Sequence, residues 1–399
     1  MQPLIGTSIA TVHLKKKEDL RIQNGHLWVF SNETAGVQHT EGALLANCFS
    51  AGGAFLGSAF YSPHSLISCR ILDRALRAEQ LCVEWLEQRL GSAVELRQKL
   101  FPGESCTRWV FGESDGLPGI VIDRYDNIAV IQTFCASADA LLPQLVEILV
   151  ERFGIETVIE RNESILREHE ELGRRRTVLK GEQPSVRKFT ELGIDFLADL
   201  WSGQKTGYFL DQKINRWIAR KISRGAEVLD CYSNVGGFSL NTICGEAIRV
   251  TTVDISAEAL QLAAQSARLN GWDGRLAVVE ADVFEFLQAE QRKQSSFDLV
   301  ILDPPSFTKN RKAVPAAKRA YVKLNGLGMS VLRSGGLLLT TSCSHHITEA
   351  TFQQCVQRAA RRCGKSIQQL ALLSQSPDHP VLPSMPETKY LKGGLYRVG

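Results

Sequence analysis

The sequence predicts an α/β fold whose C-terminal half, residues 191–399, is a doubly wound parallel sheet. Apolar runs of strand length alternate there with helix-like stretches. Successive runs end in aspartates, among them Asp254 and Asp303. Paired glycines, Gly236 and Gly237, follow the first run. Open α/β sheets bind ligands at the carboxyl ends of their strands, so these residues mark the expected site.

Length and composition fit two or three domains of an ordinary globular protein. The 399 residues are 44% hydrophobic and 22% charged. We expect no membrane span, because no apolar run approaches roughly 20 residues, and no signal peptide at the N-terminus. The ten cysteines form no Cys-x-x-Cys pair, which argues against a metal site and a disulfide scaffold and favours the cytoplasm. A net charge of +3 leaves nucleic-acid binding to local patches.

Residues 1–73 read as a small β domain. Short β-type runs are separated by glycine and asparagine turns. The segment Gly25–Phe30 is expected to form a core strand, beside a positively charged face at Lys15–Arg21. The expected strands are Ile9–Leu14, Ala54–Tyr61 and Ile67–Leu72.

Residues 74–190 predict a compact α+β module, because strands and helices alternate. Its basic tail, Arg174–Lys188, is expected to be a linker or a hairpin. The expected helices are Ala78–Leu100 and Ala138–Phe153, and the expected strands are Gly119–Asp123, Ile128–Thr133 and Thr157–Glu160.

The third part opens with a strand, Glu227–Tyr232, that runs into the glycine turn. Its paired glycines let the backbone turn tightly and approach a ligand. The next strand, Val250–Asp254, ends in an acid that could hold ribose hydroxyls. A helix at Ala257–Asn270 and a strand at Ala277–Glu280 follow. Because Gly-x-Gly-x-x-Gly is absent, a ligand with a ribose and no phosphates, such as S-adenosylmethionine, fits better than a dinucleotide.

Two later segments carry the reactive groups. Asp303 follows the apolar run Leu299–Leu302, and Cys343 follows the run Leu337–Leu339 closely. Both runs read as buried strands, so the carboxylate and the thiol should lie at one edge of the sheet. This pairing predicts an enzyme that holds a planar base and attacks it with sulfur. The alternative for Cys343 is a buried, inert thiol.

Several motifs together resemble those of the RlmI family of class I S-adenosylmethionine-dependent methyltransferases, which make 5-methylcytosine in large-subunit ribosomal RNA. The resemblance runs nearly end to end, and its Gln204–Gln212 and Asp230–Phe238 stretches are highly specific. It implies a PUA-like RNA-binding β-barrel domain, a central α+β module and a Rossmann-like methyltransferase domain. The motifs are Gly112–Gly119, Gly203–Gln212, Leu229–Phe238, Asp303–Phe307, Ser342–Ser344 and Asp378–Pro380.

The expected reaction follows from the low reactivity of carbon 5 in cytosine. Carbon 5 of cytosine becomes nucleophilic when a thiolate adds at carbon 6, and we assign that thiol to Cys343. Asp303 would hydrogen-bond the ring nitrogen and the amino edge and supply a proton. Many RNA cytosine-5 methyltransferases carry a releasing cysteine in the aspartate-proline loop, but Ser306 stands in that loop here. Neither His345 nor His346 is assigned as the base that activates the thiol.

For S-adenosylmethionine, we expect Asp254 to hold the ribose hydroxyls and Asp282 the adenine amino group. Core packing is the alternative for Tyr208 and Phe209. The other expected cofactor contacts face the methionine portion or close over it: Asp230, Tyr232, Ser233, Asn234, Gly236, Gly237, Tyr208, Phe209 and Asp211.

For the RNA, we expect contacts from the loop after Asp303 to a flipped-out or single-stranded cytosine and its phosphates. A merely solvated charged face is the alternative for its basic residues. The expected contacts are Pro304, Pro305, Phe307, Lys309, Arg311 and Lys312, and the basic loop is expected to continue through Lys318, Arg319 and Lys323.

Three other functions stay open from the sequence. A purine N-methyltransferase acting on ribosomal or transfer RNA could use the Asp303 loop without a thiol, and it would survive replacement of Cys343 by Ala. A small-molecule methyltransferase has no use for two further domains. A non-catalytic RNA-binding protein would fail to bind S-adenosylmethionine. The expected partner is ribosomal RNA, with a homodimer as the assembly to test.

Overall fold

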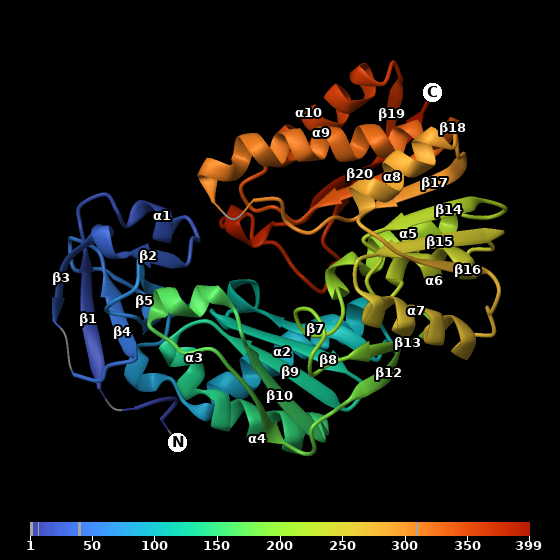
Figure 1. The fold of residues 1–399 in the computed structure, drawn as a ribbon. Helices are drawn as coiled ribbons and strands as arrows, with labels where there is room; N and C mark the ends of the chain where they lie inside the picture. Colours follow the sequence, from blue (N-terminus) through green and yellow to red (C-terminus); the bar gives the residue numbers. More distant parts are fainter. Residues whose placement is uncertain (1–2, 7, 39–40, 309) are drawn as a thin grey trace. The chain divides into compact units, whose positions relative to one another are not determined.

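The computed structural model describes residues 3–6, 8–38, 41–308 and 310–399 (Figure 1). Contacts within the chain divide it into two compact units. Unit 1 comprises Met1–Ser185 and Pro377–Lys389, and unit 2 comprises Val186–Ser376 and Tyr390–Gly399. In the described part of the chain, no helix is both long and apolar enough to cross a membrane. The division of the chain at 73/74 and 190/191 stays a prediction.

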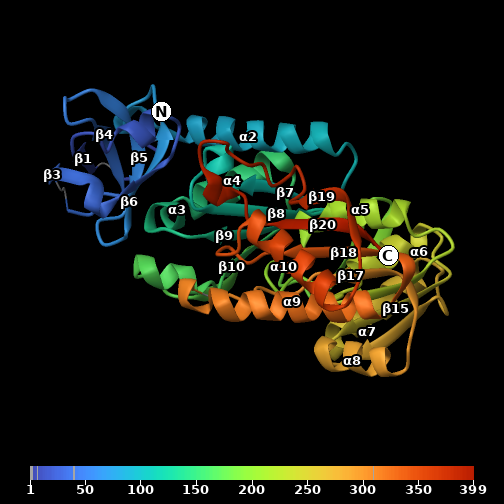
Figure 2. The same ribbon diagram turned by 90° about the horizontal axis from the view of Figure 1, so that it is seen from above.

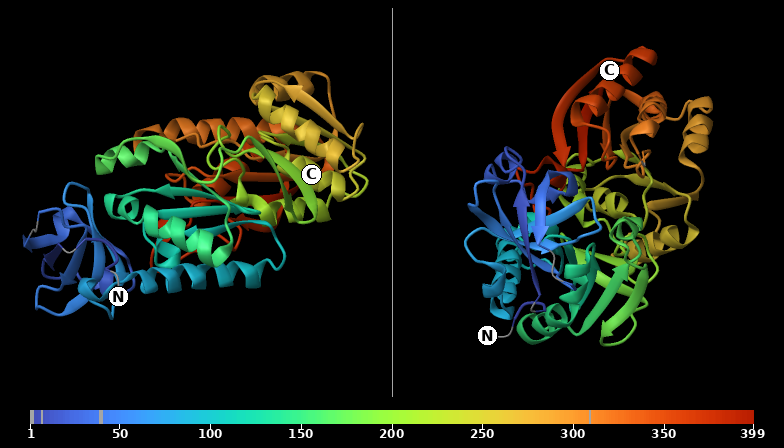
Figure 3. Two further views of the ribbon diagram at one scale, coloured as in Figure 1. Left: turned by 90° about the horizontal axis from the view of Figure 1, so that it is seen from below. Right: turned by 90° about the vertical axis from the view of Figure 1, so that its left-hand side faces the viewer.

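Unit 1 begins with a six-stranded sheet in the order β2-β6-β5-β4-β1-β3, drawn in blue in Figure 3. Only the β1–β4 pair is parallel; the other neighbours are antiparallel. Small and aliphatic side chains such as Ala10, Val12 and Ile71 fill its interior. The strands are β1 (Ile9–Leu14), β2 (Trp28–Phe30), β3 (Thr34–Gln38), β4 (Leu45–Phe49), β5 (Phe55–Tyr61) and β6 (Ile67–Asp73), with helix α1 (Leu20–Gln23) between β1 and β2.

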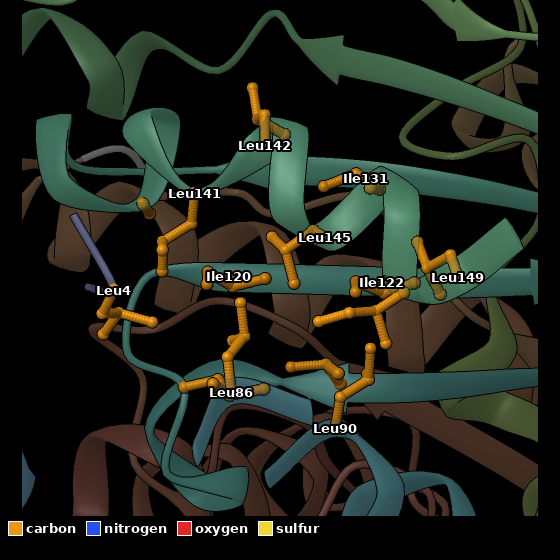
Figure 4. Close-up of a cluster of buried hydrophobic side chains, with 14 of the residues drawn as sticks. Leu4, Leu86, Leu90, Ile120, Ile122, Ile131, Leu141, Leu142, Leu145 and Leu149 are labelled. Atoms are coloured by element: carbon orange, nitrogen blue, oxygen red, sulfur yellow. The ribbon is translucent and has the colours of Figure 1, made fainter. Parts of the chain in front are cut away.

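A second sheet in unit 1 has five strands in the order β11-β10-β9-β8-β7. Leucines of helices α2 and α4 gather around Ile120 and Ile122 of β8 in one apolar core (Figure 4). Leu45 and Phe60 of the first sheet belong to the same core. The elements are β7 (Cys106–Phe111), β8 (Ile120–Tyr125), β9 (Ile128–Thr133), β10 (Thr157–Asn162), β11 (Arg175–Lys180), α2 (Val83–Leu100), α3 (Ala136–Ala140) and α4 (Leu142–Phe153).

Two expected helices of this module differ from those observed. The first begins at Val83 instead of Ala78, because Cys82 is extended and only a short 3-10 turn, Ala78–Gln80, precedes it. The second is divided at Leu141 into α3 and α4. Pro143 accounts for the break, since proline lacks an N–H and clashes with the preceding turn of a helix.

The segment Pro377–Lys389 returns to unit 1 late in the chain. The guanidinium of Arg97, which is 1% exposed, donates to both carboxylate oxygens of Asp115 and, at 2.8 Å, to the backbone carbonyl of Asp378. The Asp378 carboxylate accepts from the backbone N–H of Arg108 at 3.1 Å. Arg97 therefore joins two motifs that are far apart in the sequence, Gly112–Gly119 and Asp378–Pro380.

Unit 2 is built on a seven-stranded sheet in the order β16-β15-β14-β17-β18-β20-β19. The first five strands are parallel, and β20 and β19 are antiparallel additions. The order of the strands reverses between β14 and β17, the switch point at which such sheets bind ligands. The strands are β14 (Glu227–Cys231), β15 (Arg249–Asp254), β16 (Leu276–Glu280), β17 (Phe297–Leu302), β18 (Leu332–Ser342), β19 (Ile367–Ser374) and β20 (Lys392–Val398).

Helices cover both faces of this sheet (Figure 1). Helices α8, α9 and α10 pack on one face in a core that includes Leu287, Leu324 and Phe352, while α5, α6 and α7 lie on the other. The region expected to be a basic loop is helical from Val314 onward, so Lys318, Arg319 and Lys323 project from α9. The helices are α5 (Lys213–Lys221), α6 (Gly237–Cys244), α7 (Ala257–Leu269), α8 (Val283–Arg292), α9 (Val314–Ser330) and α10 (Glu349–Arg362).

The basic tail at Arg174–Lys188 is not a single linker or hairpin. Strand β11 pairs with β10 inside unit 1, and β12 (Val186–Glu191) forms a hairpin with β13 (Ile194–Asp199) in unit 2. The boundary between the units falls between these two strands.

Candidate active site

A cavity in unit 2 lies where the carboxyl ends of β14, β15, β17 and β18 meet. It brings together most of the residues singled out from the sequence, including Cys343 and Asp303. The predicted residues that line it are Tyr208, Phe209, Asp211, Tyr232, Ser233, Asn234, Gly237, Asp254, Asp303, Pro304, Pro305 and Cys343.

The Ser342-Cys343-Ser344 turn is held by its two serines. Ser342 Oγ donates to Tyr321 Oη at 2.7 Å, and Ser344 Oγ lies 2.8 Å from the same phenol oxygen. Lys392, on β20, donates to the carbonyl oxygens of Ser344 and Ile347 at 2.7 and 2.8 Å. Both serines are fully buried, whereas Cys343 is only partly buried and lines the cavity. Fixed serines thus hold the thiol at the cavity wall.

The same turn is tied to the loop after Asp303. Ser344 Oγ accepts from the backbone N–H of Phe307 at 3.1 Å and lies 3.1 Å from Ser306 Oγ. The Phe307 ring packs on Tyr321, with centroids 4.8 Å apart. The ring of Phe307, expected to contact substrate, therefore packs against helix α9 and does not line the cavity.

Asp303 is oriented by two donors that share one oxygen. The side-chain amide of Gln212 donates to Asp303 Oδ1 at 2.8 Å, and the hydroxyl of Thr341 donates to the same atom. Asn215 holds Gln212 by donating to its Oε1 at 2.6 Å. Oδ2 accepts no hydrogen bond from residues 3–6, 8–38, 41–308 or 310–399. Burial raises the pKa of Asp303 to about 6, so this carboxyl is partly protonated near neutral pH.

The thiol is not activated by its burial. Removal from water raises the pKa of Cys343, and the negative charges of Asp303 and Asp211 add to that effect. The positive charge of Lys205 opposes it. Lys205 lines the same cavity, 3.6 Å from Asp211 Oδ2, and its ammonium lies over the ring of Phe209. Lys205 is therefore the cation placed to favour the thiolate.

The other end of the cavity suits a nucleoside. Asp254 Oδ2 accepts from the backbone N–H of Asn234 at 2.8 Å, and Oδ1 accepts from that of Ser256 at 3.0 Å. The neighbouring Ile255 is 74% exposed and offers an apolar surface to the cavity. Asn234 Oδ1 is buried without a partner among the described residues, so it can accept a hydrogen bond from a ligand. Ribose hydroxyls, an adenine face and an ammonium group match these three features.

The glycine turn is shaped by close packing. Gly236 has φ of +80°, and an added Cβ would lie 2.9 Å from the Cβ of Ala263. At Gly237, an added Cβ would lie 3.0 Å from Tyr208 Oη. Gly236 therefore requires glycine, whereas a side chain at Gly237 would crowd Tyr208; Gly236 serves the turn without lining the cavity.

A buried ion pair supports the Tyr208–Phe209 segment. Arg216 donates twice to the carboxylate of Glu191, at 2.7 Å each, and once to the carbonyl of Phe209 at 2.9 Å. Tyr208 is 3% exposed, donates to Glu191 at 3.1 Å and packs on Phe189. Tyr208 thus belongs to the packed wall of the cavity, as the core-packing alternative expected.

Several predicted residues lie away from the cavity lining. Asp282 accepts from the backbone N–H of Glu285 and caps α8. Arg311 and Lys312 are exposed in a 3-10 turn, Arg311–Ala313, before α9. Lys309 lies outside the described residues.

Asp230 is fully buried beneath the glycine turn. Its Oδ2 accepts from the backbone N–H and the hydroxyl of Ser239, at 2.9 and 2.6 Å. Its Oδ1 finds no partner within the described part of the chain. Burial raises the pKa of Asp230 to about 7. The Asp230 side chain therefore binds the first turn of α6 and does not line the cavity.

An Asp230→Asn variant should become more stable relative to the wild type as the pH rises. The folded pKa of about 7 exceeds the unfolded value of roughly 3.9, so stability from this group is complete below pH ~4 and is lost as pH rises to about 7. Asparagine carries no charge, so the melting temperature of the variant should gain on that of the wild type across this range. Roughly 2–4 °C per kcal/mol predicts a relative gain of several degrees.

Thermal melts of the ligand-free protein from about pH 4 to 8 test this prediction. A stability difference that does not change with pH would contradict the assignment of the shift to Asp230.

Several residues that complete the cavity have no role predicted from the sequence. Lys205 and Gln212 lie inside the quoted Gly203–Gln212 motif, which was the available signal. Ile255 directly follows a strand-terminal acid, a second signal. No sequence pattern indicated a role for Arg216, because this role depends on Glu191 of a distant strand. The other such lining residues are Gln204, Val235, Phe238 and Leu391.

Comparison with known families agrees with this geometry. Residues 167–395 match the model of the S-adenosylmethionine-dependent methyltransferases, and residues 12–74 match that of a PUA-like domain. The chain belongs to the S-adenosylmethionine-dependent methyltransferase family. S-adenosylmethionine is accordingly its cofactor, and the expected PUA-like domain and methyltransferase domain are both confirmed.

Relatives of this methyltransferase match it along nearly its whole length. A protein of Alteromonas mediterranea named ribosomal RNA large subunit methyltransferase I is 37% identical, over 96% of this chain and 98% of its own. A protein of the same name from Vibrio cholerae is 35% identical, over 97% and 99%.

Solved structures share the fold. A SAM-dependent methyltransferase from Streptococcus mutans has a TM-score of 0.82 at 20% identity, covering 97% of this chain and 99% of that one. A methyltransferase complexed with SAH has a TM-score of 0.83 at 20% identity, covering 98% and 100%. At this identity the likeness concerns the fold alone.

Proposed function

We propose that this methyltransferase modifies carbon 5 of a cytosine in large-subunit ribosomal RNA through a covalent adduct with Cys343. One observation carries the proposal: Cys343 and Asp303 line the same cavity as Asp254. A thiol, a carboxyl with a raised pKa and a ribose-type acid are the groups that this reaction needs. The full-length relatives are named for methylation of large-subunit ribosomal RNA, which supports the substrate class.

Cys343 would act as the nucleophile. Its thiolate adds to carbon 6 of the cytosine, and the ring electrons make carbon 5 nucleophilic. S-adenosylmethionine supplies the methyl group as an electrophile. Loss of the carbon 5 proton to a base then restores the double bond and expels the thiolate. The protein is thereby returned to its starting state.

Asp303 would hold the base and supply a proton. Because Gln212 and Thr341 both donate to Oδ1, Oδ2 is the oxygen left to face the ring nitrogen of cytosine. With a pKa of about 6, that oxygen can give a proton as negative charge builds on the ring and take it back afterwards. Pro304 and Pro305 stiffen the loop beside the base.

Three residues would hold the cofactor. Asp254 accepts from the ribose hydroxyls, Ile255 packs against the adenine, and Asn234 accepts from the ammonium of the methionine portion. These assignments use the geometry of the cavity, in which each of the three residues lines the wall.

The test is to identify the modified nucleoside. The protein is incubated with methyl-labelled S-adenosylmethionine and large-subunit ribosomal RNA transcribed without modifications, and the RNA is digested to nucleosides. We expect the label in 5-methylcytidine. Label in an N-methylated purine would instead establish the rival reaction, which needs no thiol.

A further inference from the structure

The outer surface of unit 2 carries a basic groove between α9 and α10, which lie side by side (Figures 1 and 2). The residues from each helix recur at spacings of three, four, seven and more, so each helix contributes one continuous stripe. On α10 the stripe runs for about 16 Å, at 1.5 Å per residue. The lining residues are Pro315, Lys318, Arg319, Val322 and Lys323 of α9 and Thr351, Gln354, Cys355, Arg358 and Arg362 of α10.

The positive charge of this groove is not neutralised by the protein. Helix α9 contains no acidic residue, and the single acid of α10, Glu349, lies in its first turn and does not line the groove. No carboxylate of the described residues lies within ion-pair distance of the five lysines and arginines. In unit 1, by contrast, Arg70, Arg97 and Arg167 each pair with an acid. Like charges that converge without partners repel one another, which is a cost that a polyanionic partner removes.

The two helices that form the groove follow loops of the candidate active site. Helix α9 starts from the loop that carries Asp303, and α10 starts from the turn that carries Cys343. The inward face of α9 presents Tyr321, whose phenol oxygen bonds both serines of that turn. One helix therefore has the catalytic turn on its inner side and the basic stripe on its outer side.

We infer that this groove binds the sugar–phosphate backbone of the RNA that flanks the target nucleotide. This inference rests on the proposed function for the identity of the partner. Charge without large apolar anchors favours phosphates over a protein surface, because only Pro315, Val322 and Cys355 offer apolar contact. Thr351 and Gln354 add neutral hydrogen-bond donors of the kind that contact phosphate oxygens.

The test compares two double variants of the full-length protein that remove equal charge from the same segment. Arg358→Gln with Arg362→Gln removes both positive charges that α10 contributes to the groove. Arg361→Gln with Lys365→Gln is the matched control, since neither residue lines it. Binding of labelled large-subunit ribosomal RNA fragments and of a mixed-sequence single-stranded RNA is measured between about 50 and 200 mM salt. Thermal melting and binding of S-adenosylhomocysteine show that each variant is folded.

We expect the groove variant to bind RNA roughly ten-fold more weakly. The slope of log affinity against log salt should fall by about 1.4, or ~0.7 for each lost contact to single-stranded RNA. The KM for RNA should rise while kcat at saturating RNA stays near that of the wild type. The control should keep the wild-type affinity and slope.

Equal affinities and slopes for the two double variants would overturn the inference and leave the groove to another partner, such as an acidic protein. That result would not touch the proposed function if 5-methylcytidine is still formed. Conversely, loss of RNA binding in the groove variant, together with a methylated nucleoside other than 5-methylcytidine, would support the groove and refute the proposed reaction.

Discussion

Replacing Cys343 by Ala should abolish methyl transfer to cytosine. Without the thiolate, carbon 5 never becomes nucleophilic, so no other group of the cavity can substitute for it. We expect kcat to fall by about 10⁴-fold or more, in line with removal of the nucleophile from other enzymes that use covalent catalysis. Label transfer to ribosomal RNA under single-turnover conditions measures the effect.

The matched control is Cys231→Ala, which removes a buried thiol from β14 in the same unit. It should retain activity. Binding of S-adenosylhomocysteine by both variants separates loss of chemistry from loss of the fold. Formation of 5-methylcytidine by the Cys343→Ala protein would show that the reaction does not pass through this thiol.

Replacing Asp303 by Asn should lower kcat by about 10²- to 10³-fold. Asparagine can still accept from Gln212 and Thr341 and can point its N–H at the ring nitrogen, but it cannot give up a proton. Asp303→Ala should cost more, because the hydrogen bond to the base is lost as well. Both variants are compared with the wild type in single-turnover assays.

The pH profile distinguishes proton transfer by Asp303 from simple positioning. In the proposed reaction, activity requires a protonated Asp303, whose pKa is about 6, and an ionised Cys343, whose pKa is raised above its usual value. Between these two pKa values the protonated fraction of one group falls ten-fold per pH unit as the ionised fraction of the other rises ten-fold. The kcat/KM of the wild type should therefore be flat in that range.

In the Asp303→Asn variant, no protonated carboxyl is lost as the pH rises. Its kcat/KM should rise about ten-fold per pH unit across the same range, because only the thiolate fraction still changes. A flat profile in the variant would contradict the role of Asp303 as the proton donor.

Polar residues at the ends of apolar runs predict the position of the site from the sequence. Asp254, Asp303 and Cys343 end or follow apolar runs that form parallel strands of one sheet, so their side chains had to lie at one edge. The same pattern predicts that Asp230 lies in the cavity, but in the structure Asp230 is buried beneath α6. A residue that ends a strand can face either the ligand or the helix that follows, and strand position alone does not decide between them.

Other features depend on contacts between distant segments. No local pattern shows that Gln212 and Thr341 share one oxygen of Asp303, or that Pro377–Lys389 packs in unit 1 through Arg97. The start of α9 did have a local signal. Pro315 followed by two alanines is typical of a first helical turn, but the surrounding basic residues favoured a loop interpretation.

The proposed covalent bond between Cys343 and cytosine should be open to trapping. In RNA carrying 5-fluorocytidine, fluorine replaces the proton that must leave carbon 5, so methyl transfer can occur but the thiol cannot depart. Incubation with methyl-labelled S-adenosylmethionine should give a labelled protein–RNA complex that survives denaturing electrophoresis with the wild type and is absent with Cys343→Ala. A wild-type protein that methylates unsubstituted RNA but forms no such complex, or an equal complex in the Cys343→Ala variant, would contradict the proposed role of this sulfur.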